Sequence, residues 1–283
     1  MDFTRFRGQF RRGKGEQIVL SGNFAGNPSI FHLTGGYWVQ ESKAMIVSVI
    51  LGAVVLLQQQ PSASSVSAAD AIARLKAGNK RYVSSMAEHK NQDAATRTAL
   101  ARDQKPFAIV LSCADSRVPP EIVYDQGLGD LFVIRVAGNV PDTEIMASIE
   151  YAVEKLGTKL LVVLGHERCG AVKAALDSFY SKGKSEAHDG PSFIPTLIDE
   201  IMPAVRATKD KEGIHLDNAI AQNVINTVNE VAKTSPFKKF IEDGDLTILG
   251  SVYDLDSGEI KNIYLKQSAK AGIGAKKLDP PVK

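Results

Sequence analysis

Only two cysteines occur in the 283 residues of the chain, Cys113 and Cys169. Two cysteines in a chain of this length do not make a disulfide framework, so they either pair once or take part in chemistry. His166 lies three residues before Cys169, in the run H-E-R-C. Two thiolates and an imidazole suit zinc, and a set of three protein ligands leaves a fourth position for water or substrate. The residue types therefore allow a catalytic metal site.

Residue type alone also permits two other interpretations. Both cysteines could be small buried hydrophobic residues while His166 caps a helix. Alternatively, Cys113 and Cys169 could form a switching disulfide, because both thiols are expected at neighbouring strand ends. Metal analysis and thiol titration of the native protein would separate a metal site from a redox pair.

A carboxylate and a guanidinium follow the first cysteine closely. The run C-A-D-S-R places Asp115 two residues after Cys113 and Arg117 two residues further on. A bidentate pair with Arg117 would hold the carboxylate of Asp115 in place beside the metal. The alternative is an ordinary ion pair in a turn, which contributes little when exposed. The distance of the pair from the metal decides between the two.

The elements around these residues predict how they would meet. Continuously apolar segments at 106–113, 131–137 and 159–165 are expected to be buried parallel strands, with a helix over 142–157. Ligands of an open parallel sheet gather outside the carboxyl ends of its strands. Cys113 and His166 each come at such an end, and Cys169 follows at the turn into the next helix.

The remaining pattern predicts an α/β fold with a mostly parallel sheet flanked by helices. Ser67 is the expected N-cap of an amphipathic helix that reaches Tyr82. Two strands are expected to form a terminal hairpin around the turn at 256–258. Further helices are expected over residues 91–102, 169–182, 194–208, 216–233 and 237–243.

The two ends of the chain differ from this central part. Residues 44–57 form a run of 14 residues that are all apolar or glycine except Ser48, shorter than the roughly 20 that span a bilayer. A run of this length resembles the core of a signal peptide, with small residues following at 62–69. We expect a periplasmic or secreted protein if it is one, a cytoplasmic protein otherwise, and no stable membrane span.

These patterns predict three parts. Residues 1–66 are a leader, either a signal peptide or a disordered extension, residues 67–266 form the catalytic domain, and the Lys-, Gly- and Pro-rich residues 267–283 form a flexible tail. Lys and Arg together number 34 against 32 for Asp and Glu, so no strong positive field is available to hold nucleic acid.

Three motifs together carry a resemblance to a known family. They are C-A-D-S-R-V-P-P at 113–120, R-V-A-G-N at 135–139 and G-H-E-R-C-G-A-V at 165–172. In this order the chain resembles the β-class carbonic anhydrases over about residues 68–265. The resemblance implies their fold with an N-terminal helical arm, and an assembly into a homodimer or homotetramer.

The resemblance also implies roles for residues of the site. One zinc ion per subunit would be held by Cys113, His166 and Cys169, and Asp115 and Arg117 would be the catalytic dyad. In this family the Asp either stays paired with the Arg and leaves the fourth position to water, or rotates to become a fourth ligand and closes the site.

The substrate pocket of the family is completed across a dimer interface, and it matches Gln104, Phe132, Tyr151 and Gly170. Core packing would explain Phe132 and Tyr151 equally well. A bicarbonate-inhibited subset of the family carries Trp three residues before the first cysteine. The corresponding residue here is Val110, which argues against that form of regulation.

The implied function is the reversible hydration of carbon dioxide to bicarbonate and a proton. Zinc in carbonic anhydrases is known to lower the pKa of bound water to about 7, so a hydroxide is available for attack with Asp115 and Arg117 assisting. Carbon disulfide or carbonyl sulfide as substrate, and a permanently closed gas- or anion-binding module, remain alternatives. The histidines outside the motifs are expected at the surface without a role.

Overall fold

The computed structural model describes residues 66–181, 192–269 and 274–278, together with the backbone of short strands between residues 11 and 31. The chain divides into two units, Met1–Gln60 and Pro61–Lys283. In the first unit, strands β1 (Arg11–Arg12), β2 (Ile18–Phe24) and β3 (Asn27–Phe31) form an antiparallel sheet. No sequence pattern predicted this sheet. The apolar run at 44–57, expected to be a signal-peptide core, lies outside the described residues.

The second unit is built on a six-stranded sheet in the order β5-β4-β6-β7-β8-β9. The first four strands in this order are parallel, and β8 and β9 are antiparallel to their neighbours. The strands are β4 (Ala108–Ser112), β5 (Leu131–Arg135), β6 (Leu160–His166), β7 (Thr247–Tyr253), β8 (Ile260–Lys266) and β9 (Ala275–Lys277). The predicted α/β fold with a mostly parallel sheet is confirmed.

Hydrophobic sequence explains the centre of this sheet. Every residue of β4 and of β6 is buried. Strands covered on both faces are continuously apolar, because the side chains on each face pack against helices. Alternate residues of β6 contribute to two separate hydrophobic clusters, one on each face of the sheet. The strand ends that carry Cys113 and His166 are therefore fixed by packing on both sides.

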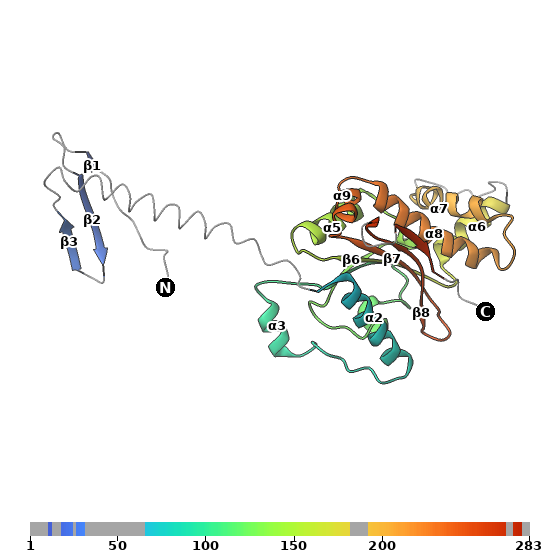
Figure 1. The fold of residues 1–283 in the computed structure, drawn as a ribbon, viewed down its shortest axis with the longest axis horizontal. Helices are drawn as coiled ribbons and strands as arrows, with labels where there is room; N and C mark the ends of the chain where they lie inside the picture. The colour runs from blue at the N-terminus through green and yellow to red at the C-terminus, as the bar shows by residue number, and fades with distance from the viewer. Residues whose placement is uncertain are drawn as a thin grey trace. The chain divides into compact units, whose positions relative to one another are not determined.

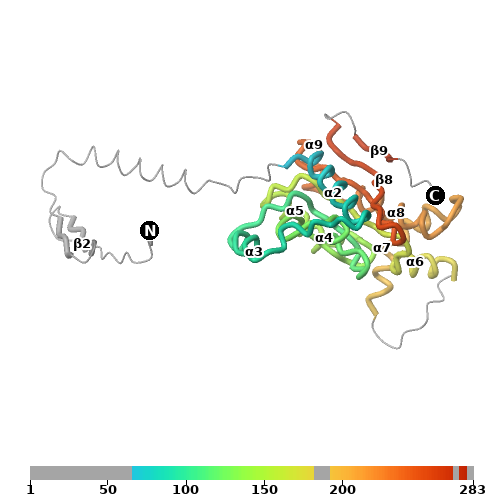
Figure 2. Tube along the Cα trace, turned by 90° about the horizontal axis from the view of Figure 1, so that it is seen from below, coloured from blue at the N-terminus to red at the C-terminus, as the bar shows by residue number. Residues whose placement is uncertain are grey.

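Helix α2 (Ala68–Val83) covers one face of the sheet. It begins at the predicted cap, where the side chain of Ser67 accepts a hydrogen bond from the Asp70 N–H. Ala71 and Leu75 of this helix are buried in the same cluster as alternate residues of β4 and β6. Figure 2 views the molecule from this side, and α2 and α4 (Pro120–Val123) lie in front of the strands.

The other face of the sheet is covered by three helices, α5, α8 and α9 (Figure 1). Helices α6 and α7 pack against each other and against α8 near the carboxyl ends of the parallel strands. Their bounds are α5 (Thr143–Glu154), α6 (Gly170–Tyr180), α7 (Ile194–Thr208), α8 (His215–Lys233) and α9 (Phe237–Asp243).

Several predicted boundaries shift for local reasons. The helix expected over 91–102 is α3 (Ala94–Leu100), because the Asp93 side chain caps it by accepting from the Thr96 N–H. The 3-10 turn η1 (Ala137–Asn139) and the single-turn helix α4 were not predicted. Within the expected tail, β9 pairs with β8 and extends the sheet by an edge strand.

The predicted hairpin is confirmed, since β7 and β8 are antiparallel neighbours. Gly258 occupies its turn with φ of 77°, a conformation that glycine adopts without steric cost. Among the described residues, none of the helices is both long enough and apolar enough to cross a membrane.

Candidate metal centre

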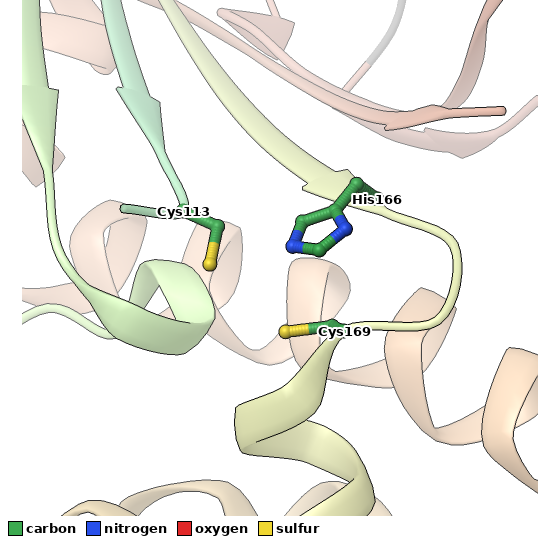
Figure 3. A group of neighbouring side chains, drawn as sticks. All are labelled: Cys113, His166 and Cys169. Carbon is green, nitrogen blue, oxygen red and sulfur yellow. The ribbon is translucent and has the colours of Figure 1, made fainter. Parts of the chain in front are cut away.

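The three predicted metal ligands come together at one edge of the sheet. Cys113 directly follows β4, His166 is the last residue of β6, and Cys169 is the N-cap of α6. The two Sγ atoms and one ring nitrogen all lie within 4.8 Å of one another, and all three residues are buried. Figure 3 shows the three side chains pointing toward a common centre. Small side-chain movements would bring all three onto one ion at bond lengths of about 2.0 to 2.3 Å.

The turn between His166 and Cys169 is fixed from outside. The Glu167 N–H donates to the Tyr253 carbonyl at 2.9 Å, which extends the pairing of β6 with β7. Arg168 has φ of 52°, and its guanidinium donates two hydrogen bonds to the Asp256 carboxylate at 2.8 and 2.9 Å. The left-handed residue reverses the chain direction, so Cys169 comes back toward His166.

The imidazole of His166 has one nitrogen engaged and one free. Nδ1 lies 2.9 Å from the Glu167 carbonyl, so the carbonyl selects the tautomer that carries its proton on Nδ1. Nε2 then offers a lone pair, and it is fully buried without a hydrogen-bond partner in the described part of the chain. Buried polar atoms without partners are uncommon, and a metal ion is the partner that suits a neutral imidazole nitrogen.

The two thiols share their electrostatic environment. A hydrogen bond from the Cys169 thiol lowers the pKa of Cys113 to about 4, more than burial raises it. The same contact, together with burial, raises the pKa of Cys169. The Gly138 N–H also lies 3.4 Å from Cys113 Sγ and favours its thiolate. The two sulfurs therefore favour sharing a single proton, and a bound dication would replace it.

Asp115 and Arg117 form the predicted pair beside these ligands. Arg117 Nε and Nη2 donate to the two carboxylate oxygens of Asp115 at 2.9 and 2.8 Å, and the Arg117 N–H adds a third bond at 2.9 Å. These bonds hold the pKa of Asp115 well below its usual range. Asp115 Oδ2 lies 3.9 Å from His166 Nε2. The pair is thus next to the ligand atoms, and Asp115 is bound to the guanidinium.

Two residues of the R-V-A-G-N motif hold the first ligand in place. Arg135 donates to the carbonyls of Cys113 at 3.1 Å and Asp115 at 2.6 Å. Gly138 has φ of 69°, and a Cβ there would lie 2.7 Å from Ile201 Cδ1. The motif was recognised from the sequence, but these contacts were not, since they join residues that only the pairing of β4 with β5 and the packing of α7 on η1 bring together.

Within this chain, only one of the four predicted pocket residues lies beside the metal ligands. Gly170 is the first residue of α6, beside Cys169, and a Cβ there would meet nothing within 4 Å, so open space adjoins the ligands. Phe132 and Tyr151 contact each other, with ring centroids 6.3 Å apart. Phe132 pairs with Ile109, four residues before Cys113, which is about 13 Å along the strand. Gln104 is exposed in the loop before β4.

Comparisons with known proteins agree with this geometry. A sequence model described as carbonic anhydrase matches residues 108–260. "Carbonic anhydrase 2" of Mycobacterium tuberculosis is 40% identical over 188 residues, which cover 65% of this chain and 87% of that protein. The carbonic anhydrase of Pseudomonas aeruginosa is 33% identical over 175 residues, covering 57% of this chain and 75% of the relative.

Solved structures show the same fold. The Coccomyxa β-carbonic anhydrase in complex with acetazolamide superposes with a TM-score of 0.54 and 25% identity, covering 69% of this chain and 87% of that one. A tetrameric β-carbonic anhydrase from Sordaria macrospora, 24% identical with a TM-score of 0.52, covers 66% of this chain and 93% of that one. From the ligand geometry, the matched residues and these likenesses together, the chain belongs to the β-carbonic anhydrase family.

Proposed function

We propose that this protein catalyses the reversible hydration of carbon dioxide to bicarbonate, with one zinc ion per subunit held by Cys113, His166 and Cys169. The observation that carries the proposal is Nε2 of His166, which is buried, has no hydrogen-bond partner among the described residues and is directed at two cysteine sulfurs. Zinc bound by these ligands would act as a Lewis acid and supply a hydroxide nucleophile near neutral pH.

Asp115 is suited to orient the water of the reaction. Its carboxylate is kept ionised by Arg117, so throughout the neutral range it acts as a hydrogen-bond acceptor that positions this water. Because both of its oxygens accept from the guanidinium, Asp115 is held in place beside the ligand cluster by Arg117. This arrangement corresponds to the form of the family site in which the fourth position stays available to water.

Carbon dioxide is uncharged and apolar, so its binding site needs apolar walls near the ligands. Gly170 adjoins open space, and Ala137 lies in the turn that packs against β4, β6 and α6. Phe132, Tyr151 and Gln104 are directed elsewhere within one chain. We assign them to the pocket of a second subunit, as in a homodimer or homotetramer, and the Sordaria relative is described as tetrameric.

The test combines zinc quantitation with stopped-flow CO2 hydration on the purified full-length chain. The wild-type protein should contain one zinc per subunit and hydrate CO2, while Cys169→Ser should lose both. Chelation followed by zinc addition to the wild type is the control, and it should restore the rate. Full activity of Cys169→Ser with unchanged metal content would overturn the assignment.

The same preparation tests the alternatives. If the protein instead uses Cys113 and Cys169 as a redox pair, thiol titration would detect a reversible disulfide and no zinc. Carbonyl sulfide and carbon disulfide should be hydrolysed more slowly than CO2 is hydrated. If either compound were turned over faster than CO2, that compound and not CO2 would be the substrate.

A further inference from the structure

A cavity of about 220 Å³ lies beneath α2, away from the metal centre. Ile72, Leu75 and Lys76 of α2 line it, together with Tyr124, Leu249 and Asn262 from the segment and strands below the helix. Along the sheet, the lining residue Leu249 lies four residues, about 13 Å, before Tyr253, which pairs with His166. The lining residue Ile260 lies at the level of His166 but two strands away from it.

Tyr124 is the most unusual residue of this lining. The residue is only 3% exposed, and its hydroxyl makes no hydrogen bond to any described residue. Tyr124 lines the cavity, and its hydroxyl is not among the fully enclosed unpartnered atoms of the described residues, so it is open to whatever fills the cavity. No described group of the chain satisfies this hydroxyl, so its partner would come from whatever occupies the cavity.

Two further polar groups are available in the lining. Asn262 accepts a hydrogen bond from the Ser251 hydroxyl through its Oδ1 at 2.9 Å, which leaves its Nδ2 donor for another partner. Lys76 is exposed on α2 and makes no ion pair with any described residue. Asn79, in contrast, uses both ends of its amide on the backbone of the chain. The donors that remain are a hydroxyl, an amide and an ammonium group.

The rest of the lining is apolar, from Ile72, Leu75, Leu249 and Ile260. The volume is smaller than the roughly 300 to 1,000 Å³ of pockets for drug-sized ligands, so the occupant has the size of one ring or a short chain. We infer that this cavity is a binding site for a small organic monocarboxylate. The carboxylate bonds to Lys76, Tyr124 and Asn262, and its apolar body contacts the aliphatic side chains.

This chemistry distinguishes the site from a pocket for inorganic anions or water. A carbonate-sized or phosphate-sized ion would leave the aliphatic wall without contacts, and water would use neither the aliphatic wall nor the charge of the ammonium group. A neutral molecule of the same shape would forgo the charge-assisted hydrogen bonds, which are about twice as strong as neutral ones. The site does not depend on the zinc or on the proposed hydration reaction.

Isothermal titration of the zinc-loaded full-length protein with benzoate tests the inference, with isosteric benzamide as the uncharged control. The metal position is first saturated with acetazolamide, so that binding at zinc does not contribute. Benzoate should bind and benzamide should bind at least about tenfold more weakly. Lys76→Met should weaken benzoate binding about tenfold or more, whereas Lys80→Met, one turn later on α2, should not change it.

Tyr124→Phe separates a ligand contact from a structural role. Removing an unpartnered buried hydroxyl should leave the melting temperature unchanged or raise it, yet weaken benzoate binding several-fold. A lower melting temperature with unchanged benzoate affinity would make the hydroxyl structural. Equal affinities in wild type and Lys76→Met, equal binding of benzamide, or a crystal grown with benzoate whose cavity contains only water would each overturn the proposal.

Discussion

At the scale of single residues, the site combines groups whose charge states are set by their nearest neighbours. A carbonyl fixes the His166 tautomer, a thiol and an N–H favour the Cys113 thiolate, and a guanidinium keeps Asp115 ionised. Each effect acts through hydrogen bonds from immediate neighbours. The chemistry of the site is therefore sensitive to substitutions that preserve shape and change only charge.

Asp115→Asn is such a substitution. Because Asp115 is proposed to assist the reaction without binding the metal, the variant should keep its zinc and lose CO2 hydration activity by about 10²-fold or more. Arg117 holds the pKa of Asp115 far below neutrality, so the loss should be the same from about pH 6 to about pH 9. Stopped-flow rates and zinc content measure both quantities.

The control for this change is Asp177→Asn, which removes an exposed carboxylate on α6 that pairs with Lys173. Its activity should equal that of the wild type. If Asp115→Asn lost its zinc, Asp115 would be a structural ligand, and its assignment as an assisting group would be wrong.

At the scale of elements, short turns place the ligands between strands and helices. The turn η1 brings the Gly138 N–H to Cys113, and Asn223 of α8 secures this turn by donating to the Gly138 carbonyl at 2.8 Å. The turn before α6 depends on Arg168 and Asp256. Elements distant in sequence thus hold each ligand, which predicts that backbone substitutions in these turns affect zinc affinity.

Gly138→Ala tests this dependence. The left-handed φ of 69° costs a residue with Cβ about 1 to 2 kcal/mol, and the overlap with Ile201 adds about 1 to 3 kcal/mol. The variant should lose stability in urea unfolding and bind zinc more weakly in a chelator competition. Gly244→Ala is the matched control, with φ of 88° and nothing within 4 Å of its Cβ. It should lose stability only, so equal zinc affinities in both variants would contradict the prediction.

The buried carboxylate of Asp125 connects helix α2 to the segment that follows it. It accepts from Arg81 of α2 at 2.6 Å and from the N–H groups of Glu88 and His89 at 3.0 and 3.1 Å. Burial alone would raise the pKa of Asp125, but these hydrogen bonds outweigh it and keep the pKa lowered. The stabilisation is therefore present above the unfolded pKa of about 3.9 and is lost as the pH falls through the folded value.

Asp125→Asn should accordingly destabilise the protein by about 1 to 3 kcal/mol at pH 7, since Arg81 loses the nearer of its two acidic partners and keeps only Glu88, at 3.8 Å. Asn tolerates the left-handed φ of 47° at this position, so the change reports on charge and not on strain. Urea unfolding from pH 7 down to about pH 3 should show the two proteins converging in stability below about pH 4. A gap that stayed constant across this range would refute the role of the carboxylate charge.

At the scale of the whole molecule, the second unit provides the ligands and dyad in one chain but not the complete pocket. The parallel strands end together, so Cys113 and His166 meet, whereas Phe132 lies four residues back along the sheet. Tyr151, 50% exposed, lies against Phe132, and Gln104 is exposed. Exposed residues that match a family pocket are expected to serve the site of another subunit.

Mixing two inactive variants tests this sharing directly. Gln104→Ala and Asp115→Asn should each be nearly inactive alone. If each site draws Asp115 from one subunit and Gln104 from the other, random dimers refolded together contain intact sites, and about a quarter of wild-type activity should return. A site contained in one chain would recover none, and light scattering should confirm that the mixture is oligomeric.

The sequence by itself determined the alternation of strands and helices, the N-cap at Ser67 and the three candidate metal ligands. Each of these depends on local information, namely apolar runs long enough for buried strands, a capping side chain, and motifs in a fixed order. The resemblance indicated that Asp115 and Arg117 act as a pair. Because the two residues are only two positions apart in the chain, their hydrogen bonds could also be expected from the sequence.

Only the tertiary structure decided the contacts between residues far apart in the chain. Arg168 and Asp256 are separated by 88 residues, Asn79 and Gly258 by 179, and the cavity beneath α2 is enclosed by segments from three parts of the sequence. The local sequence pattern likewise did not predict strand β9 or its pairing with β8. Periodicity reports which face of an element is buried, but the partners of that face follow from sheet order and packing of the folded chain.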